Sequence, residues 1–295
     1  MTIITTEALT KSYLRSQALQ DLSLRIKQNT ITGLVGRNGA GKTSLLKILA
    51  GQIRPTSGSV RVLNEEPFNN LFISSQTILI SDDLKFPSTL SLEEILQMGE
   101  SFYPKWDMDF ALKLFSYFYF NKENFYYELS KGKRSTFNII FGLSTRSSLT
   151  LFDEPTSGMD AAVRKDFYQI LLKEYLDQPR TIIISSHYLE EIENLLEDLL
   201  LIDQGKKVLH LPIDEVSNYA VSITGSTKSL EKILDGKIIT SRKVDDDSTT
   251  FIVKADESIQ KLAQEKHIIN RVKPNDLCIY LTEDEGGIDD VLSRN

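Results

Sequence analysis

A short glycine-rich segment ending in lysine and threonine is the part of the sequence best suited to chemistry. It matches the phosphate-loop pattern G-x-x-x-x-G-K-[ST], in which backbone N–H groups and the lysine bind nucleotide phosphates and the final hydroxyl binds Mg²⁺. The residues concerned are Gly36, Arg37, Asn38, Gly39, Ala40, Gly41, Lys42 and Thr43, followed by Ser44. An apolar run at 31–35 and a helix-forming run at 43–50 flank the segment, as a phosphate loop requires. The sequence therefore predicts a nucleotide site here.

Two adjacent carboxylates, Asp153 and Glu154, end a second apolar run at 149–152. We expect Asp153 to hold Mg²⁺ through water, as an acidic residue does in phosphate-loop enzymes. Glu154 would lie nearer the terminal phosphate, where it could polarise the attacking water. The alternative is a pair of solvated carboxylates at a strand end, and the segment Pro155-Thr156-Ser157-Gly158-Met159-Asp160 that follows argues against it.

Together these segments resemble the nucleotide-binding subunit of an ATP-binding cassette (ABC) transporter. The matching pieces are GRNGAGKT at 36–43, LFDEPTSGMD at 151–160 and SSH at 185–187, within a resemblance that covers about residues 3–211. It implies ATP and Mg²⁺ as cofactors and two cassettes that close head to tail over two ATP molecules.

The resemblance also assigns roles to single residues. It implies that Glu154 is the catalytic base and that His187 is the switch histidine contacting the γ-phosphate. Asp160 would belong to the loop that crosses the interface between the two cassettes. Tyr13, 23 residues before Gly36, stands where the family keeps an aromatic ring to stack on adenine. Simple packing is the alternative role for this tyrosine.

The family signature, usually Leu-Ser-Gly-Gly-Gln, is altered here to Leu-Ser-Lys-Gly-Lys at 129–133. Ser130 and Gly132 are retained and would offer a hydroxyl and a backbone N–H to the γ-phosphate of the partner's ATP. Lys131 and Lys133 replace a glycine and the glutamine, and we expect these two cations to add attraction for the anion at this helix start.

The family's Gln loop, which senses Mg²⁺ and links the site to the membrane partner, is altered as well. Its position, counted back from Leu90-Ser91-Leu92, falls on Asp82, and the nearest glutamine, Gln76, lies six residues too early. We expect Asp82 to offer an oxygen to Mg²⁺ in place of the glutamine.

The elements around these motifs predict an α/β protein of two domains, which agrees with a length of 295 residues at about 150 residues per domain. Residues 1–211 would form an ABC-type ATPase domain with the phosphate-loop NTPase fold, a mixed sheet and a helical subdomain at about 83–145. Residues 212–295 would form a small accessory or regulatory α/β domain. Its expected strands are 220–224, 238–243, 249–253 and 268–272, and its expected helices are 229–234 and 257–266. This βαββαβ order suggests a ferredoxin-like fold.

Composition restricts the choice of partners. The formal net charge of −7, from 34 basic and 41 acidic residues, argues against a nucleic-acid partner. The single cysteine, Cys278, leaves no internal disulfide and no cysteine-based zinc site. No apolar run approaches the ~18 residues of a membrane span, and the N-terminus lacks the layout of a signal peptide. We expect a soluble, cytoplasmic chain that reaches the inner face of the membrane through a permease.

Eight aromatic residues between 115 and 127 bear on that partner. Adjacent members of the run cannot all face one core at 3.6 residues per turn. We expect about half of them to be core residues, and the others to receive a cytoplasmic helix of the membrane subunit.

The sequence as a whole favours an ATPase that powers a separate integral membrane permease and pairs with a second ABC ATPase subunit, identical or related. The altered signature and the C-terminal domain are most similar to bacterial exporter cassettes of the bacitracin-resistance and YtrB-like kind, so export of a peptide, antibiotic or lipid is favoured. One alternative is a nucleotide-gated regulatory subunit with weak hydrolysis, suggested by Lys131, Lys133 and Asp82. Another is a soluble ABC protein of translation or DNA repair, which the single phosphate loop, the length and the acidic balance oppose.

Overall fold

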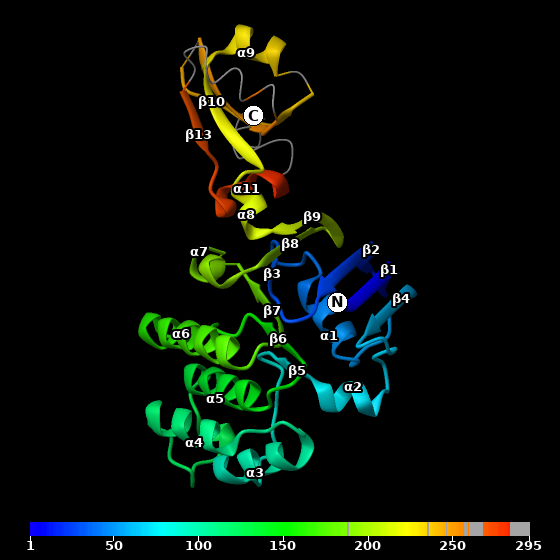
Figure 1. Cartoon of the computed structure of the whole chain (residues 1–295), viewed down its shortest axis with the longest axis vertical. Coiled ribbons are helices and arrows are strands. Elements are labelled where there is room, and N and C mark those ends of the chain that lie inside the picture. The colour runs from blue at the N-terminus through cyan, green and yellow to red at the C-terminus, as the bar shows by residue number, and fades with distance from the viewer. Residues whose placement is uncertain (188, 235, 246, 257–258, 260–267, 284–295) are drawn as a thin grey trace. The chain divides into compact units, whose positions relative to one another are not determined.

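The computed structural model describes residues 1–187, 189–234, 236–245, 247–256, 259 and 268–283, and the chain divides into two compact units (Figure 1). The first unit comprises Met1–His187 and Glu191–His210, and the second comprises 188–190 and 211–295.

A six-stranded sheet in the order β5-β6-β7-β3-β8-β9 forms the centre of the first unit. Its strands are β3 (Ile31–Val35), β5 (Thr77–Ile80), β6 (Leu149–Asp153), β7 (Thr181–Ser186), β8 (Asp198–Asp203) and β9 (Lys206–Pro212). The pairs β5–β6, β6–β7, β7–β3 and β3–β8 are parallel. Strands β3, β5, β6 and β7 are apolar and almost wholly buried, as parallel strands covered on both faces require. The carboxyl ends of β6, β7 and β3 therefore lie side by side at one edge.

A three-stranded antiparallel sheet, ordered β2-β1-β4, packs against the helix that follows β3. The elements are β1 (Thr2–Tyr13), β2 (Ser16–Lys27), β4 (Ser57–Val62) and α1 (Lys42–Leu49). Along β2, Leu22, Leu24 and Ile26 alternate with exposed residues, which is the period-2 pattern of a half-buried strand. Leu45 and Leu49 of α1 belong to one core cluster with side chains of both sheets, so α1 is held between them.

Helices cover the β5 side of the unit, where Figure 1 shows α3, α4 and α5 gathered together. The helices between residues 71 and 195 are α2 (Leu71–Gln76), α3 (Leu92–Phe102), α4 (Met108–Tyr117), η1 (Tyr126–Glu128), α5 (Lys131–Ser144), α6 (Ala161–Asp177), α7 (Leu189–Ile192) and η2 (Glu193–Leu195). Ser91 and Glu94 form a capping box at the start of α3. After β7 the chain forms two short helical pieces, α7 and η2, and residue 188 before them lies outside the described residues. Within the described part of the chain, no helix is both long and apolar enough to cross a membrane.

The second unit contains a four-stranded antiparallel sheet in the order β11-β12-β10-β13. Its elements are α8 (Ile213–Val216), β10 (Ala220–Ser226), α9 (Thr227–Ile233), β11 (Ile238–Lys243), β12 (Ser248–Lys254), β13 (Ile268–Arg271) and α11 (Pro274–Thr282). Strand β12 lies between β10 and β11, which is the split βαβ arrangement of a ferredoxin-like fold. Of the helix expected at 257–266, only Ile259 is among the described residues, and it packs in this unit's core cluster.

Candidate nucleotide site

The phosphate loop connects β3 to α1 at the carboxyl edge of the sheet. Gly41 has a φ of 104°, and a Cβ atom there would lie 2.2 Å from the Ala18 carbonyl oxygen, so only glycine fits. Lys42 is buried, and its Nζ donates to the carbonyl oxygens of Gly36 at 2.7 Å and Arg37 at 3.3 Å. A cavity of about 300 Å³ is lined by Tyr13, Ser16, Ala18, Asn38, Gly39, Ala40, Gly41, Lys42, Thr43, Ser44 and Glu154.

Thr43 and Asp153 come together although they lie far apart in the sequence. Thr43 Oγ1 donates to Asp153 Oδ2 at 2.6 Å, and Ser185 Oγ donates to Asp153 Oδ1 at 2.7 Å. A hydroxyl and one carboxylate are oxygen ligands of the kind that Mg²⁺ uses together with nucleotide phosphates and water. Among the described residues no three His, Cys, Asp or Glu side chains form a metal-binding group.

Glu154 lies between the loop lysine and the histidine. Its Oε1 is 3.7 Å from Lys42 Nζ, and its Oε2 is 3.3 Å from His187 Nδ1. The backbone N–H of Glu154 donates to Ser185 Oγ at 2.9 Å, and its φ is 47°, in the left-handed region that non-glycine residues seldom adopt. The carboxylate is about one-third exposed, so water can reach it.

Tyr13 lines the same cavity, with its hydroxyl 3.3 Å from Ser44 Oγ and the Lys11 ammonium 5.1 Å from its ring centre. Almost half of its side chain is exposed, so the ring is available to a planar base.

Three of the expected nucleotide-binding residues do not line the cavity at the phosphate loop of their own chain. Ser130, Gly132 and Asp160 line a separate cavity of about 740 Å³. Ser130 Oγ caps α5 by accepting from Lys133 N, and Asp160 Oδ1 caps α6 by accepting from the N–H groups of residues 162 and 163. A Cβ at Gly132 would lie 2.8 Å from Gly158 O, so the signature and the loop before α6 meet backbone to backbone.

Each of the two signature lysines has partners within the chain. Lys131 Nζ lies 3.1 Å from Asp82 Oδ2 and 3.2 Å from Ser157 Oγ. Lys133 Nζ donates to Phe118 O at 2.7 Å and lies 4.7 Å from the Phe120 ring centre. The expectation that both cations attract the anion at the helix start therefore does not hold for Lys133, whose ammonium secures the end of α4.

The two candidate residues for the Gln loop, Asp82 and Gln76, have different partners in different parts of the unit. Asp82 is bound to Lys131, whereas Gln76 Oε1 accepts from Ser148 Oγ at 2.8 Å, beside the amino end of β6. Gln76 is thus tied at the edge of the sheet opposite the phosphate loop.

The aromatic run is divided between core and surface. Phe115, Phe118 and Tyr126 are buried, and Tyr117, Tyr119 and Tyr127 are exposed. Tyr117 and Tyr119 line the same cavity as the signature residues Ser130 and Gly132.

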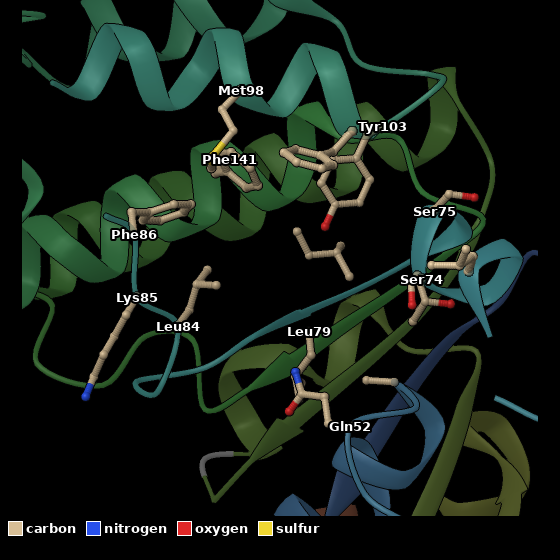
Figure 2. Close-up of a pocket in the computed structure, with 15 residues that line it drawn as sticks. Gln52, Ser74, Ser75, Leu79, Leu84, Lys85, Phe86, Met98, Tyr103 and Phe141 are labelled. Atoms are coloured by element: carbon tan, nitrogen blue, oxygen red, sulfur yellow. The ribbon is translucent and has the colours of Figure 1, made fainter. Parts of the chain in front are cut away.

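A further cavity, of about 500 Å³, lies between α2, α3 and the segment after β5. Figure 2 shows Phe86, Met98 and Phe141 grouped on one side of it, with Gln52, Ser74 and Ser75 across the opening. Its lining also includes Leu71 and Phe102, whose side chains are largely exposed.

Ser185 is the functional residue that sequence reasoning left without a role, although it lies in the SSH segment. Its hydroxyl contacts both carboxylate-bearing residues, and this dual contact depends on the pairing of Asp153 with Ser185 between β6 and β7. In the sequence, only the place of Ser185 in the SSH segment at 185–187 could have indicated this role.

The comparisons with known proteins agree with this geometry. The family model described as ABC transporter matches residues 19–157. The chain is 28% identical over 215 residues to the ABC transporter ATP-binding protein YtrB of Bacillus subtilis, covering 73% of this chain and 74% of that protein. It is 31% identical over 223 residues to the bacitracin transport ATP-binding protein BcrA of Bacillus licheniformis, covering 73% and 71%.

A solved structure of a dimeric ATP-binding cassette in a post-hydrolysis state, bound to ADP and phosphate, has a TM-score of 0.64 with this chain. The alignment is 18% identical and covers 72% of this chain and 99% of that one. The likeness confirms the expected phosphate-loop ATPase fold.

Proposed function

This chain belongs to the ATP-binding proteins of the ABC transporter family and is an ATPase, and we propose that it powers a separate membrane permease by hydrolysing ATP at Glu154. The family membership confirms the resemblance drawn from the motifs at 36–43, 151–160 and 185–187. The observation that carries the proposed site is the connected set of side chains from Thr43 through Asp153 and Ser185 to Glu154.

We propose that each of these residues has a distinct task. Lys42 and the loop N–H groups bind the phosphates, while Tyr13 stacks on the base. Thr43 and Asp153 hold Mg²⁺, which when bound neutralises charge on the terminal phosphates. Glu154 accepts a proton from the attacking water, and His187, within 3.3 Å of its carboxylate, fixes its orientation.

We propose that a second ATP-binding subunit, identical or related, completes each site. Ser130 and Gly132 line a cavity distinct from the phosphate-loop cavity, so one chain does not supply both halves. Tyr117 and Tyr119 share that cavity, and we therefore assign them to the contact with the second subunit and not to the permease.

The permease contact is then proposed for the cavity of Figure 2, whose lining combines apolar and polar side chains. Leu71 is 88% exposed and Phe102 is 67% exposed, which leaves apolar surface available to an amphipathic cytoplasmic segment of the permease. Such a contact would place the chain at the inner face of the membrane. Replacing Leu71 and Phe102 with serine should abolish co-purification with the permease, whereas Leu176→Ser, a change of an exposed leucine on α6, should not.

The transported substrate is proposed to be a peptide, antibiotic or lipid moved outward, because a bacitracin transport ATP-binding protein is among the relatives. Transport into inside-out vesicles holding this chain and its permease tests the direction. Accumulation only in right-side-out vesicles contradicts it.

Glu154→Gln tests the proposed catalytic site. Losing a general base should lower turnover by about 10²–10⁴-fold, while ATP still binds because Lys42 and the loop are unchanged. Glu191→Gln, a change of a glutamate on α7 that pairs with Arg164, is the matched control and should keep its turnover. A Glu154→Gln chain that still hydrolyses ATP at the normal rate would refute the assignment.

The regulatory alternative is favoured by one observation, the bond between Asp82 and Lys131, which occupies two positions that differ from the family pattern. It predicts that the native chain with its permease shows almost no ATP turnover. The same assay therefore separates the two functions.

A further inference from the structure

Two loops of the first unit meet at the ammonium of Lys131. Its Nζ is 3.1 Å from Asp82 in the segment after β5 and 3.2 Å from Ser157 in the loop after β6. The stem of the lysine lies against Gly158. Lys131 is the first residue of α5, directly after Ser130, so its ammonium is tethered beside the helix start.

A more highly charged anion can displace Asp82 from its ion pair with Lys131. The side chains of Lys131 and Asp82 are 62% and 59% exposed, and exposed ion pairs contribute little to stability. Lys133 differs, because its ammonium is part-buried between the Phe118 carbonyl and the Phe120 ring. Of the two signature lysines, Lys131 is therefore the one that can exchange its partner.

A nucleotide phosphate is the stronger anion that the proposed pairing would bring to this surface. It carries more negative charge than one carboxylate, and lysine binds phosphate as a flexible point charge. We propose that Lys131 binds the phosphate of a nucleotide held by the second subunit and gives up Asp82 to do so. This inference rests on the proposed function, in which Ser130 and Gly132 face that nucleotide.

The exchange gives Asp82 a definite role as a competitor for Lys131. While the subunits are apart, Asp82 and Ser157 hold the ammonium against the chain. When the subunits close, Lys131 transfers to the phosphate, and the Asp82 carboxylate is free of its cation. Substitutions at the two ends of one ion pair should therefore change subunit pairing in opposite directions.

The test measures the dissociation constant of the ATP-dependent dimer by analytical ultracentrifugation, using the full chain in the Glu154→Gln background. Lys131→Ala should weaken pairing by about 10- to 150-fold per site, the scale of one hydrogen bond to a charged group. Lys131→Arg should restore most of it. Asp82→Asn should tighten pairing by up to about five-fold, because a weak surface pair no longer competes.

Two controls distinguish phosphate binding by Lys131 from a general effect of losing a surface ion pair. Lys122→Ala removes the matched exposed pair of Lys122 with Glu93, at 3.3 Å, and should leave pairing unchanged. Asp82→Asn should have no effect once Lys131 is alanine, since Asp82 acts through that lysine. Binding of ATP to the chain's own phosphate loop reports that each variant is folded.

Several results would overturn the inference. If Lys131→Ala pairs as strongly as the unchanged chain, Lys131 does not bind the phosphate. If Asp82→Asn weakens pairing both with Lys131 present and with Lys131 replaced by alanine, Asp82 acts on the metal and not through Lys131. A Glu154→Gln chain that stays monomeric with ATP overturns the proposed subunit pairing itself, and this inference with it.

Discussion

Replacing Ser185 with alanine should damage both stability and catalysis, because one hydroxyl serves two residues of the site. Ser185 Oγ donates to Asp153 Oδ1 at 2.7 Å and accepts from the backbone N–H of Glu154 at 2.9 Å, and Ser185 is fully buried in β7. Loss of a hydrogen bond to a carboxylate costs about 1.5–3 kcal/mol, and loss of the amide's partner adds about 1 kcal/mol. Both neighbours are partly exposed, so water offsets part of this, and we expect about 2–3 kcal/mol of lost stability.

The assay is thermal unfolding together with steady-state ATP turnover. For a unit of about 200 residues, this loss corresponds to a fall in Tm of about 4–12 °C. Glu154 would lose the bond that fixes its left-handed backbone, and a displacement of about 1 Å at a catalytic group can cost ~10²-fold in rate. We also expect a higher Mg²⁺ concentration for half-maximal activity, since Asp153 would be less well oriented.

Thr150→Val provides the matched control on the neighbouring strand. Thr150 is fully buried in β6, and its hydroxyl makes no hydrogen bond within the described residues. Its isosteric replacement should leave Tm and turnover unchanged or slightly raise Tm. The reasoning is refuted if Ser185→Ala matches the wild type in both measurements, or if Thr150→Val is equally harmful.

Three further changes test other parts of the first unit. Gly132→Ala places a Cβ 2.8 Å from Gly158 O and should weaken ATP-dependent pairing in ultracentrifugation without changing ATP affinity; equal pairing would contradict the close approach. Glu174→Ala leaves the buried Arg180 without its carboxylate at 3.4 Å and should cost about 3–5 kcal/mol in denaturant unfolding; an unchanged midpoint would show that the pair contributes nothing. Burial lowers the pKa of His210 below its ordinary 6.5, so protons bind the unfolded chain more strongly and this contribution to stability is lost as the pH falls below about 6.5. His210→Asn should therefore lose less Tm between pH 7.5 and 5.5 than the wild type does, and equal losses would contradict this.

Local patterns predicted the parts of the site whose chemistry is contained in a few consecutive residues. The phosphate loop needs glycine at set spacings, so its position and flanking elements follow from the sequence, as does the capping box at Ser91 and Glu94. The half-buried β2 was readable for the same reason, because alternation of Leu22 and Leu24 with polar residues is a one-strand property.

Contacts between distant segments were not readable in this way. The double role of Ser185 depends on the register between β6 and β7, and the pairing of Lys131 with Asp82 depends on how α5 meets the segment after β5. Lys133 was read as a free cation because the backbone carbonyl that it binds, at Phe118, has no sequence signature.

The sheet order has a consequence for the sequence of events in folding. β7 lies between β6 and β3, and its pairing joins Ile31 to Ile182 and Val35 to Ser186. The strand bearing the phosphate loop is made early in synthesis, yet its neighbour on one side is made about 150 residues later. Such long-range pairings form slowly. A nascent chain therefore leaves the backbone N–H and C=O groups on this side of β3 unpaired until β7 has emerged, so the strand that leads into the phosphate loop stays without this neighbour during that interval.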